Sequence, residues 1–148
     1  FYLLFSFVFV VARGGLGGLA IGRRLKASPV ADLKLAQVEL GWSSRRPAGD
    51  YARMLRRVLD AGASFRRAGS GALGVAYVAD GRSDAYAELH INSWDCLAGI
   101  VMVEEAGGWT NDFLAGDGMA KGNAILATAP GLRDAMIKAT GIGAEVMA

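Results

Sequence analysis

The chain has 148 residues, of which 53% are hydrophobic and 20% charged, and its net charge is +2. This length suffices for one domain with its own core. The balance of 16 basic and 14 acidic residues argues against nucleic-acid-binding or membrane-surface proteins, which carry strong charge fields. The single cysteine, Cys96, excludes a disulfide within the chain and favours a reducing, intracellular setting with a buried, inert thiol. The single histidine, His90, has no Cys or His companion, which argues against a zinc site.

Residues 1–12 are almost wholly apolar and form a first segment of unclear origin. A membrane span needs about 20 such residues, so the run is too short, and without an initiating Met or a basic leader it is a poor signal peptide. We expect a buried strand or strand pair whose beginning has been cut off, with a remnant of a membrane segment as the alternative. The five glycines of residues 13–22 predict a turn or hairpin.

Further along, strand-like and helix-like patterns alternate without an internal repeat. Apolar residues recur at helical spacing over 50–62, and Asp50 is the candidate cap. A helix over 93–106, capped by Ser93, is apolar on all sides in its middle, which predicts a position between layers. The other predicted elements are strands at 37–40, 64–67, 84–89, 109–112 and 125–128, and helices at 70–79 and 132–139. This alternation predicts a layered α/β domain over residues 13–148.

Two features suggest chemistry. Gly69-Ser70-Gly71 stands at a predicted strand-to-helix junction, where free backbone N–H groups suit an anion or a hydroxylated ligand; a tight turn that requires glycine is the alternative. Asp95 falls in the first turn of a predicted helix, where the helix dipole stabilises a carboxylate that can offer an oxygen to a hard cation such as Mg²⁺. Taken alone, Asp95 is better interpreted as an ordinary first-turn residue, because one carboxylate does not make a metal site.

The run from Gly69 to Gly108 resembles the second signature region of the inositol monophosphatase family. The family pattern is Gly-Ser/Thr-Ala-Ala, an aromatic-Glu pair, Trp-Asp-x-Ala-Ala-Gly and Glu-Ala-Gly-Gly, and the order, the spacing and the rare Trp-Asp pair all fit. Weaker similarity extends the resemblance to roughly residues 13–140. The sequence departs from the pattern at three positions: Gly71 and Leu97 stand where the family usually has alanine, and Ala87 replaces the aromatic residue before Glu88.

The resemblance implies an αβαβα-type sugar phosphatase fold, of which this chain is the C-terminal part, with a mixed sheet flanked by helices. It also implies that Asp95 is a catalytic residue that binds magnesium and that Glu88 binds a hydroxyl of the substrate ring. Gly69, Ser70 and Gly71 match the segment whose backbone lines the same pocket. By the same resemblance, Mg²⁺ activates the attacking water, and the full-length protein is a cytoplasmic homodimer.

The family's first signature, Asp-Pro-Ile/Leu-Asp-Gly-Thr, is absent from this sequence, and most of the metal ligands belong to that missing part. We therefore interpret the chain as the C-terminal half of a magnesium-dependent hydrolase of inositol monophosphate or a related polyol or sugar phosphate, and expect little activity from this fragment alone. The partner is then a small phosphate ester, with no nucleic acid or membrane involved. The alternatives are a non-catalytic remnant that binds a ligand or partner, and a nucleotide or fructose bisphosphatase of the same superfamily.

Overall fold

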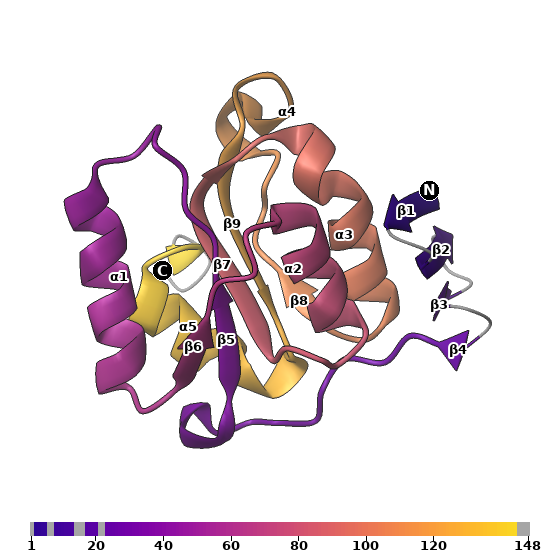
Figure 1. Cartoon of the computed structure of the whole chain (residues 1–148), viewed down its shortest axis with the longest axis horizontal. Coiled ribbons are helices and arrows are strands. Elements are labelled where there is room, and N and C mark those ends of the chain that lie inside the picture. Colours follow the sequence, from indigo (N-terminus) through magenta and orange to yellow (C-terminus); the bar gives the residue numbers. More distant parts are fainter. Residues whose placement is uncertain (1, 6–7, 14–16, 21–22, 145–148) are drawn as a thin grey trace.

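The computed structural model describes residues 2–5, 8–13, 17–20 and 23–144. They form two β-sheets and two layers of helices (Figure 1). The first sheet is antiparallel, in the order β1-β2-β3-β4. Its strands are β1 (Tyr2–Phe5), β2 (Val8–Arg13), β3 (Gly17–Ala20) and β4 (Arg23–Arg24).

The second sheet is mixed, in the order β6-β5-β7-β9-β8. Strand β5 runs parallel to both β6 and β7, whereas β9 runs antiparallel to β7 and β8. The five strands are β5 (Gln37–Leu40), β6 (Ser64–Arg66), β7 (Ala85–Ile91), β8 (Trp109–Thr110) and β9 (Asn123–Thr128).

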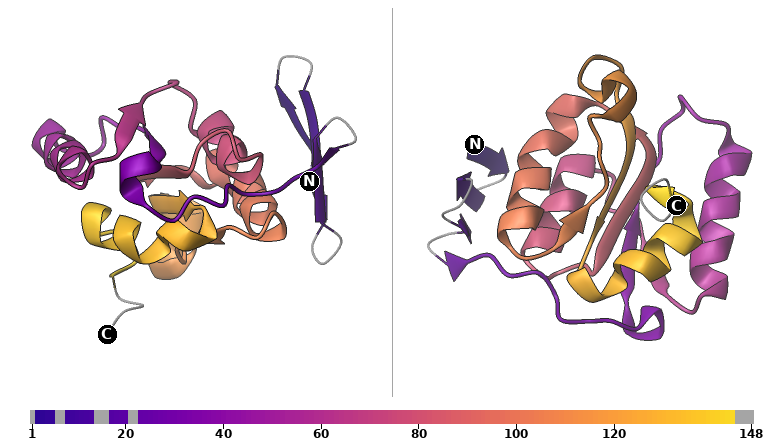
Figure 2. Two further views of the ribbon diagram at one scale, coloured as in Figure 1. Left: turned by 90° about the horizontal axis from the view of Figure 1, so that it is seen from below. Right: turned by 180° about the vertical axis from the view of Figure 1, so that it is seen from behind.

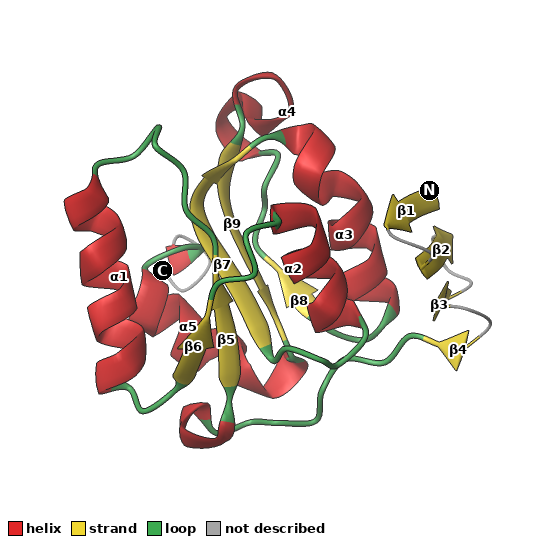
Figure 3. Ribbon diagram, in the orientation of Figure 1, coloured by secondary structure: helices red, strands yellow, loops and turns green. Residues whose placement is uncertain are grey.

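Helices cover both faces of the mixed sheet (Figure 3). On one face lie α1 (Ala48–Asp60) and α5 (Arg133–Thr140), and on the other α2 (Gly71–Ala79) and α3 (Ser93–Glu105). Helix α3 also contacts β2 and β3, so it lies between the two sheets (Figure 2), as its apolar composition predicts. The short helical elements are Leu33–Leu35, Ala115–Asp117, α4 (Gly118–Lys121) and Pro130–Leu132.

The core consists of two apolar clusters, one on each face of the mixed sheet. Strand β7 contributes to both because successive side chains of a strand point to opposite faces. Tyr86 packs with α2 and α3, whereas Ala85 and Ala87 pack with α1 and α5. A central strand buried on both faces is therefore mainly apolar, and a carboxylate on it, such as Glu88, needs a specific partner.

Most predicted elements are present with shifted ends, but two predicted caps are wrong. The cap of α1 is Pro47, and Asp50 lies inside the first turn, where it pairs with Arg46 and Arg53. The cap of α3 is Asn92, and Ser93 is the first helical residue. The strand predicted at 109–112 ends at Thr110, and α4 was not predicted.

The apolar segment forms the backbone of β1 and β2, which agrees with the predicted strand pair, and β3 follows within the predicted hairpin region. Of these regions, residues 1, 6–7, 14–16 and 21–22 lie outside the described part. Among the helices that the structure describes, none is long and apolar enough to cross a membrane.

The packing of α2 on α3 gives a test of the helical layer. A Cβ added at Gly99 would lie 2.6 Å from Val75 Cγ1 and 2.9 Å from Val75 Cβ. We expect Gly99→Ala to lower the free energy of unfolding by about 1–3 kcal/mol, because α2 and α3 must move apart. In the matched control Gly49→Ala, the new Cβ meets only Arg53 Nη1 at 3.5 Å, so stability should stay level or rise by up to about 1 kcal/mol. Urea unfolding followed by circular dichroism measures both; equal effects would contradict this packing.

Candidate active site

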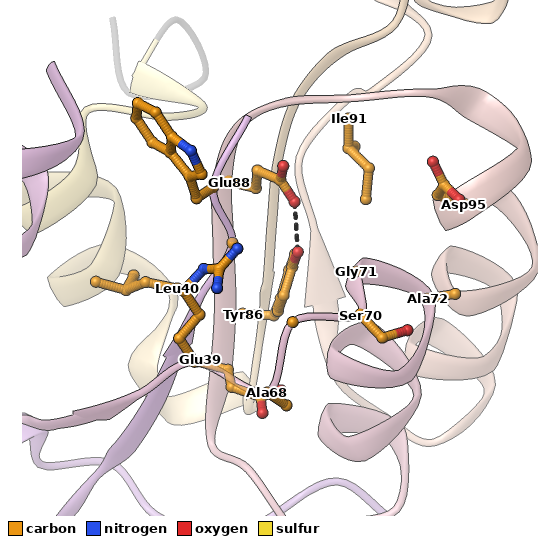
Figure 4. Close-up of a pocket in the computed structure, with 14 residues that line it drawn as sticks. Glu39, Leu40, Ala68, Ser70, Gly71, Ala72, Tyr86, Glu88, Ile91 and Asp95 are labelled. Carbon is orange, nitrogen blue, oxygen red and sulfur yellow. Dashed lines mark hydrogen bonds between the residues drawn. The ribbon is translucent and has the colours of Figure 1, made fainter. Parts of the chain in front are cut away.

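One cavity, of about 350 Å³, brings together all the predicted site residues (Figure 4). It lies where β5 ends, at the loop before α2, beside β7 and the first turn of α3. Gly69, Ser70, Gly71, Glu88 and Asp95 all line it. The other lining residues are Glu39, Leu40, Gly41, Trp42, Arg67, Ala68, Ala72, Tyr86 and Ile91.

The start of α2 forms one wall of the cavity. Ser70 caps the helix, because its hydroxyl accepts a hydrogen bond from the Leu73 N–H at 3.3 Å. The first N–H groups of a helix have no intrahelical acceptor, so those of Gly71 and Ala72, which both line the cavity, are candidate donors to an anion or a hydroxyl. A Cβ at Gly71 would lie 2.5 Å from Ile91 Cδ1, so glycine in place of the family's usual alanine fits the bulk of Ile91.

Glu88 projects from β7 into the cavity and is only 7% exposed. The Tyr86 hydroxyl donates a hydrogen bond of 2.5 Å to Glu88 Oε2. Burial raises the pKa of the Glu88 carboxyl; the Tyr86 bond opposes this rise and the nearby Asp95 adds to it. Burial, together with the charge of Glu88, also raises the pKa of Tyr86, so the phenol keeps its proton and remains a donor.

Asp95 lies half-buried in the first turn of α3. Its side chain makes no hydrogen bond or ion pair with the described residues, which leaves both oxygens available to a ligand. The adjacent Trp94 is 75% exposed and does not line the cavity, so of the Trp-Asp pair only the aspartate belongs to the site.

The described residues offer Asp95 as one oxygen ligand for magnesium but do not form a complete site. No group of three or more His, Cys, Asp or Glu side chains within residues 23–144 is arranged to hold a metal ion. Magnesium is usually bound by one or two carboxylates, substrate phosphates and several waters. Among the described residues, Asp95 thus fits a contribution of one oxygen ligand to a magnesium site.

Nine of the lining residues were not predicted, and four of these have charged or aromatic side chains: Glu39, Trp42, Arg67 and Tyr86. Glu39 is buried, with neither carboxylate oxygen hydrogen-bonded, and its Oε1 lies 3.5 Å from Arg66 Nε. Burial raises the pKa of Glu39, and the charge of Arg66 opposes the shift. The sequence did carry a signal for Glu39, which is a charged residue inside the predicted strand at 37–40. Charged residues are almost never fully buried unless they are paired, so its position on a buried strand indicated a specific role.

A second cavity, of about 270 Å³, adjoins the first. Trp42, Glu88, Ile91 and Asp95 line both, so they form a shared wall. Trp42 packs edge to face against Tyr51, with 5.3 Å between ring centroids, which fixes its orientation. The residues that line only the second cavity are Ser43, Ser44, Arg45, His90 and Asn92.

Cys96 lies on α3 directly after Asp95 and is fully buried. Burial, with the nearby charges of Asp95 and Glu88, raises the pKa of its thiol to about 12. The thiolate is the reactive form of cysteine, so the buried, inert thiol expected from the sequence is what the structure contains.

Comparison with known proteins identifies the family. The model of the "Inositol monophosphatase family" matches residues 9–141, and the chain belongs to this family. Its relatives include "Nus factor SuhB" of Escherichia coli (strain K12), which is 37% identical over 129 residues that cover 85% of this chain and 48% of the relative. "Inositol-1-monophosphatase" of Mesorhizobium japonicum is 32% identical over 136 residues, which cover 89% of this chain and 50% of the relative.

Solved structures agree with the observed fold. The extragenic suppressor protein SuhB from Bartonella henselae superposes with a TM-score of 0.81 at 33% identity, covering 92% of this chain and 53% of that chain. Mycobacterium tuberculosis SuhB gives a TM-score of 0.80 at 31% identity, covering 90% and 54%. The predicted fold class, a mixed sheet flanked by helices, is confirmed. The chain spans about half the length of the relatives it matches.

The raised pKa of Glu88 gives a stability test. A carboxyl with a raised folded pKa binds more protons in the folded than in the unfolded state, so its contribution becomes unfavourable as pH rises above the ordinary value of 4.5. Glu88→Gln removes the charge and keeps an acceptor for Tyr86. Without added metal, we expect this variant to match the wild type below pH 4.5 and to gain stability relative to it as pH rises.

The control for this test is Asp134→Asn, a change at an exposed carboxylate on α5. Its stability difference from the wild type should stay nearly constant over the same pH range. Urea unfolding at several pH values measures all three proteins. A Glu88→Gln difference that does not grow above pH 4.5 would show that the carboxylate is not desolvated as described.

Proposed function

We propose that this chain is the C-terminal part of a magnesium-dependent phosphomonoesterase that hydrolyses inositol monophosphate or a related polyol or sugar phosphate. The observation that supports it is the convergence of the α2 start, Glu88 and Asp95 on one cavity, in a chain of the inositol monophosphatase family. In this proposal the enzyme acts in the cytoplasm, its full-length form is a homodimer, and neither nucleic acid nor a membrane is a partner.

Each group has a distinct proposed task. Glu88 accepts a hydrogen bond from a hydroxyl of the polyol, and Tyr86 holds its carboxylate in place. The backbone of Gly69, Ser70 and Gly71 forms the wall against which the ring lies. Asp95 gives an oxygen to Mg²⁺, which when bound supplies Lewis-acid chemistry at the phosphate. The remaining ligands must come from outside residues 23–144.

The names of several relatives favour a second candidate function for this chain. Proteins of four genera among them are named "Nus factor SuhB", a name that describes a factor and no phosphatase activity. This chain would then act as a non-catalytic module in a transcription-related role and bind a partner protein. The two candidates differ in whether the cavity binds a polyol phosphate through Glu88.

Ligand binding tests the proposed site directly. We expect inositol 1-phosphate to bind the wild-type chain, and Glu88→Gln to weaken this binding by about tenfold, because it removes a charged acceptor. Asp95→Asn should leave binding in EDTA unchanged and remove the gain in affinity that Mg²⁺ produces. Calorimetric titration with and without Mg²⁺ measures both effects.

The matched control is Asp60→Asn, which removes one carboxylate from an exposed ion pair on α1. It should bind inositol 1-phosphate as the wild type does. If Glu88→Gln binds as tightly as this control, the polyol does not contact Glu88 and the second candidate gains.

A catalytic assay tests whether the magnesium ligands are divided between this chain and residues outside it. We expect the purified 148-residue chain to release no more phosphate from inositol 1-phosphate in Mg²⁺ than its Asp95→Asn variant, because one carboxylate holds magnesium weakly. In a longer protein that joins this chain to the other ligands, Asp95→Asn should abolish magnesium-dependent turnover. A phosphate-release assay measures both. Robust turnover by the isolated chain would refute the prediction that Asp95 is only one of several magnesium ligands and that the others lie outside this chain.

A further inference from the structure

The three tryptophans of the chain lie in three different settings. Trp94 is 75% exposed and lines neither cavity of the site. Trp109 packs against the apolar cluster of α1 and α5, and the Arg133 guanidinium lies 5.1 Å from its ring centroid. Trp42 is half-buried and lines both cavities. Its ring therefore keeps accessible surface inside the site, and the tasks proposed above leave that surface unused.

The backbone on either side of Trp42 is held in place. The Gly41 N–H donates a hydrogen bond of 2.9 Å to the Ala87 carbonyl of β7. A Cβ at Gly41 would collide with Glu88 Oε2, so this backbone lies directly against the carboxylate. Residues 43–46 form a hydrogen-bonded turn. Trp42 therefore leaves the chain beside Glu88, between two fixed segments.

The ring of Trp42 is held by Tyr51 of α1. The two ring centroids lie 5.3 Å apart with 74° between the planes, and Tyr51 packs against the core cluster of α1 and α5. Burial raises the pKa of Tyr51, and the charge of Glu88 adds to this rise, which agrees with the position of both rings near that carboxylate. A ligand does not need to order a side chain that is already held, so little entropy is lost on contact.

Trp42 presents the accessible aromatic surface of the main cavity. The other aromatic lining residue, Tyr86, is 3% exposed, and the large aliphatic ones, Leu40 and Ile91, are 1% and 5% exposed. The face of an aromatic ring carries partial negative charge, which attracts the polarised C–H groups of a sugar or polyol. An indole beside the buried acceptor Glu88 thus suits a ring that carries hydroxyls on its rim and C–H groups on its face.

We propose that Trp42 is a specificity-determining residue, whose indole packs against the C–H face of a cyclic polyol phosphate while Glu88 accepts from a hydroxyl on the rim of the same ring. This inference rests on the proposed function, since the polyol occupies the site described above. An open-chain polyol phosphate has no such face, so Trp42 makes the site prefer ring polyols. Trp42 has no part in the chemical step.

The test compares inositol 1-phosphate with sorbitol 6-phosphate. The two ligands carry the same numbers of carbon atoms, hydroxyls and phosphates and differ in ring closure. We expect Trp42→Ala to weaken binding of inositol 1-phosphate by about tenfold and that of sorbitol 6-phosphate by less than about twofold, because only the ring loses an aromatic contact. Calorimetric titration in Mg²⁺ measures both affinities.

Three further variants make the test specific. Trp42→Phe keeps an aromatic face and should keep most of the preference for inositol 1-phosphate, whereas Trp42→Leu keeps apolar bulk alone and should lose it. This pair decides the question even if Trp42→Ala does not fold. The matched control Trp94→Ala removes an exposed indole next to Asp95 and should bind both ligands as the wild type does. Equal affinities in Trp42→Phe and Trp42→Leu, or equal losses for both ligands in Trp42→Ala, would overturn the proposal.

Fluorescence reports the contact directly. In the double variant Trp94→Phe, Trp109→Phe, Trp42 is the single tryptophan of the chain. Its emission should change as inositol 1-phosphate saturates the site, because the indole passes from water to a ligand face. Emission that stays the same at saturation would contradict the proposed contact.

The outcomes also separate this proposal from the one on which it rests. If Glu88→Gln weakens binding of inositol 1-phosphate but the Trp42 variants affect both ligands alike, the aromatic contact fails and the proposed function stands. If Trp42→Ala selectively weakens inositol 1-phosphate while Glu88→Gln and Asp95→Asn have no effect, the proposed function fails and the aromatic contact stands.

Discussion

The hydrogen bond from Tyr86 to Glu88 is the interaction around which the site is built. Three glycines, from two segments, approach this pair more closely than a side chain permits. A Cβ at Gly41 would collide with the Glu88 carboxylate and the Tyr86 hydroxyl, one at Gly71 would lie 3.1 Å from that hydroxyl, and one at Gly74 would lie 2.5 Å from the Tyr86 ring. The loop after β5 and the first turn of α2 can therefore close on β7 only because these positions are glycine.

This arrangement follows from the central position of β7. The strand is covered by helices on both faces, so its carboxylate is largely buried and needs a hydrogen-bond donor. Tyr86, two residues earlier, points to the same face and supplies the donor. The burial that raises the pKa of Glu88 also holds its carboxylate at the wall of the cavity, so under the proposed function stability and ligand binding are opposed at this residue.

Much of the fold could be predicted from the sequence because its signals are local. The periodicity of the helix at 50–62 and the apolar middle of the helix at 93–106 depend on neighbouring residues alone. Helix caps were less predictable: Ser93 and Asp50 have suitable side chains, but the chain enters each helix one to three residues earlier. Among site residues, Gly69, Glu88 and Asp95 were found through one motif, but Tyr86 within the same run was missed because its role depends on its contact with Glu88. Glu39 and Trp42 come from an earlier segment that only the tertiary fold brings to Glu88.

The charge of the cavity explains why the carboxylates of the proposed site need a metal cation beside them. Glu39, Glu88 and Asp95 line one cavity, so a phosphate ester entering it meets like charge in a setting of reduced dielectric. Positive charge must accompany the ligand, and among the lining residues only Arg67 provides it. One exposed guanidinium cannot balance three carboxylates and a phosphate dianion. Under the proposed function, a divalent cation at Asp95 would supply the positive charge that Arg67 alone cannot, so phosphate binding in this cavity would depend on the cation.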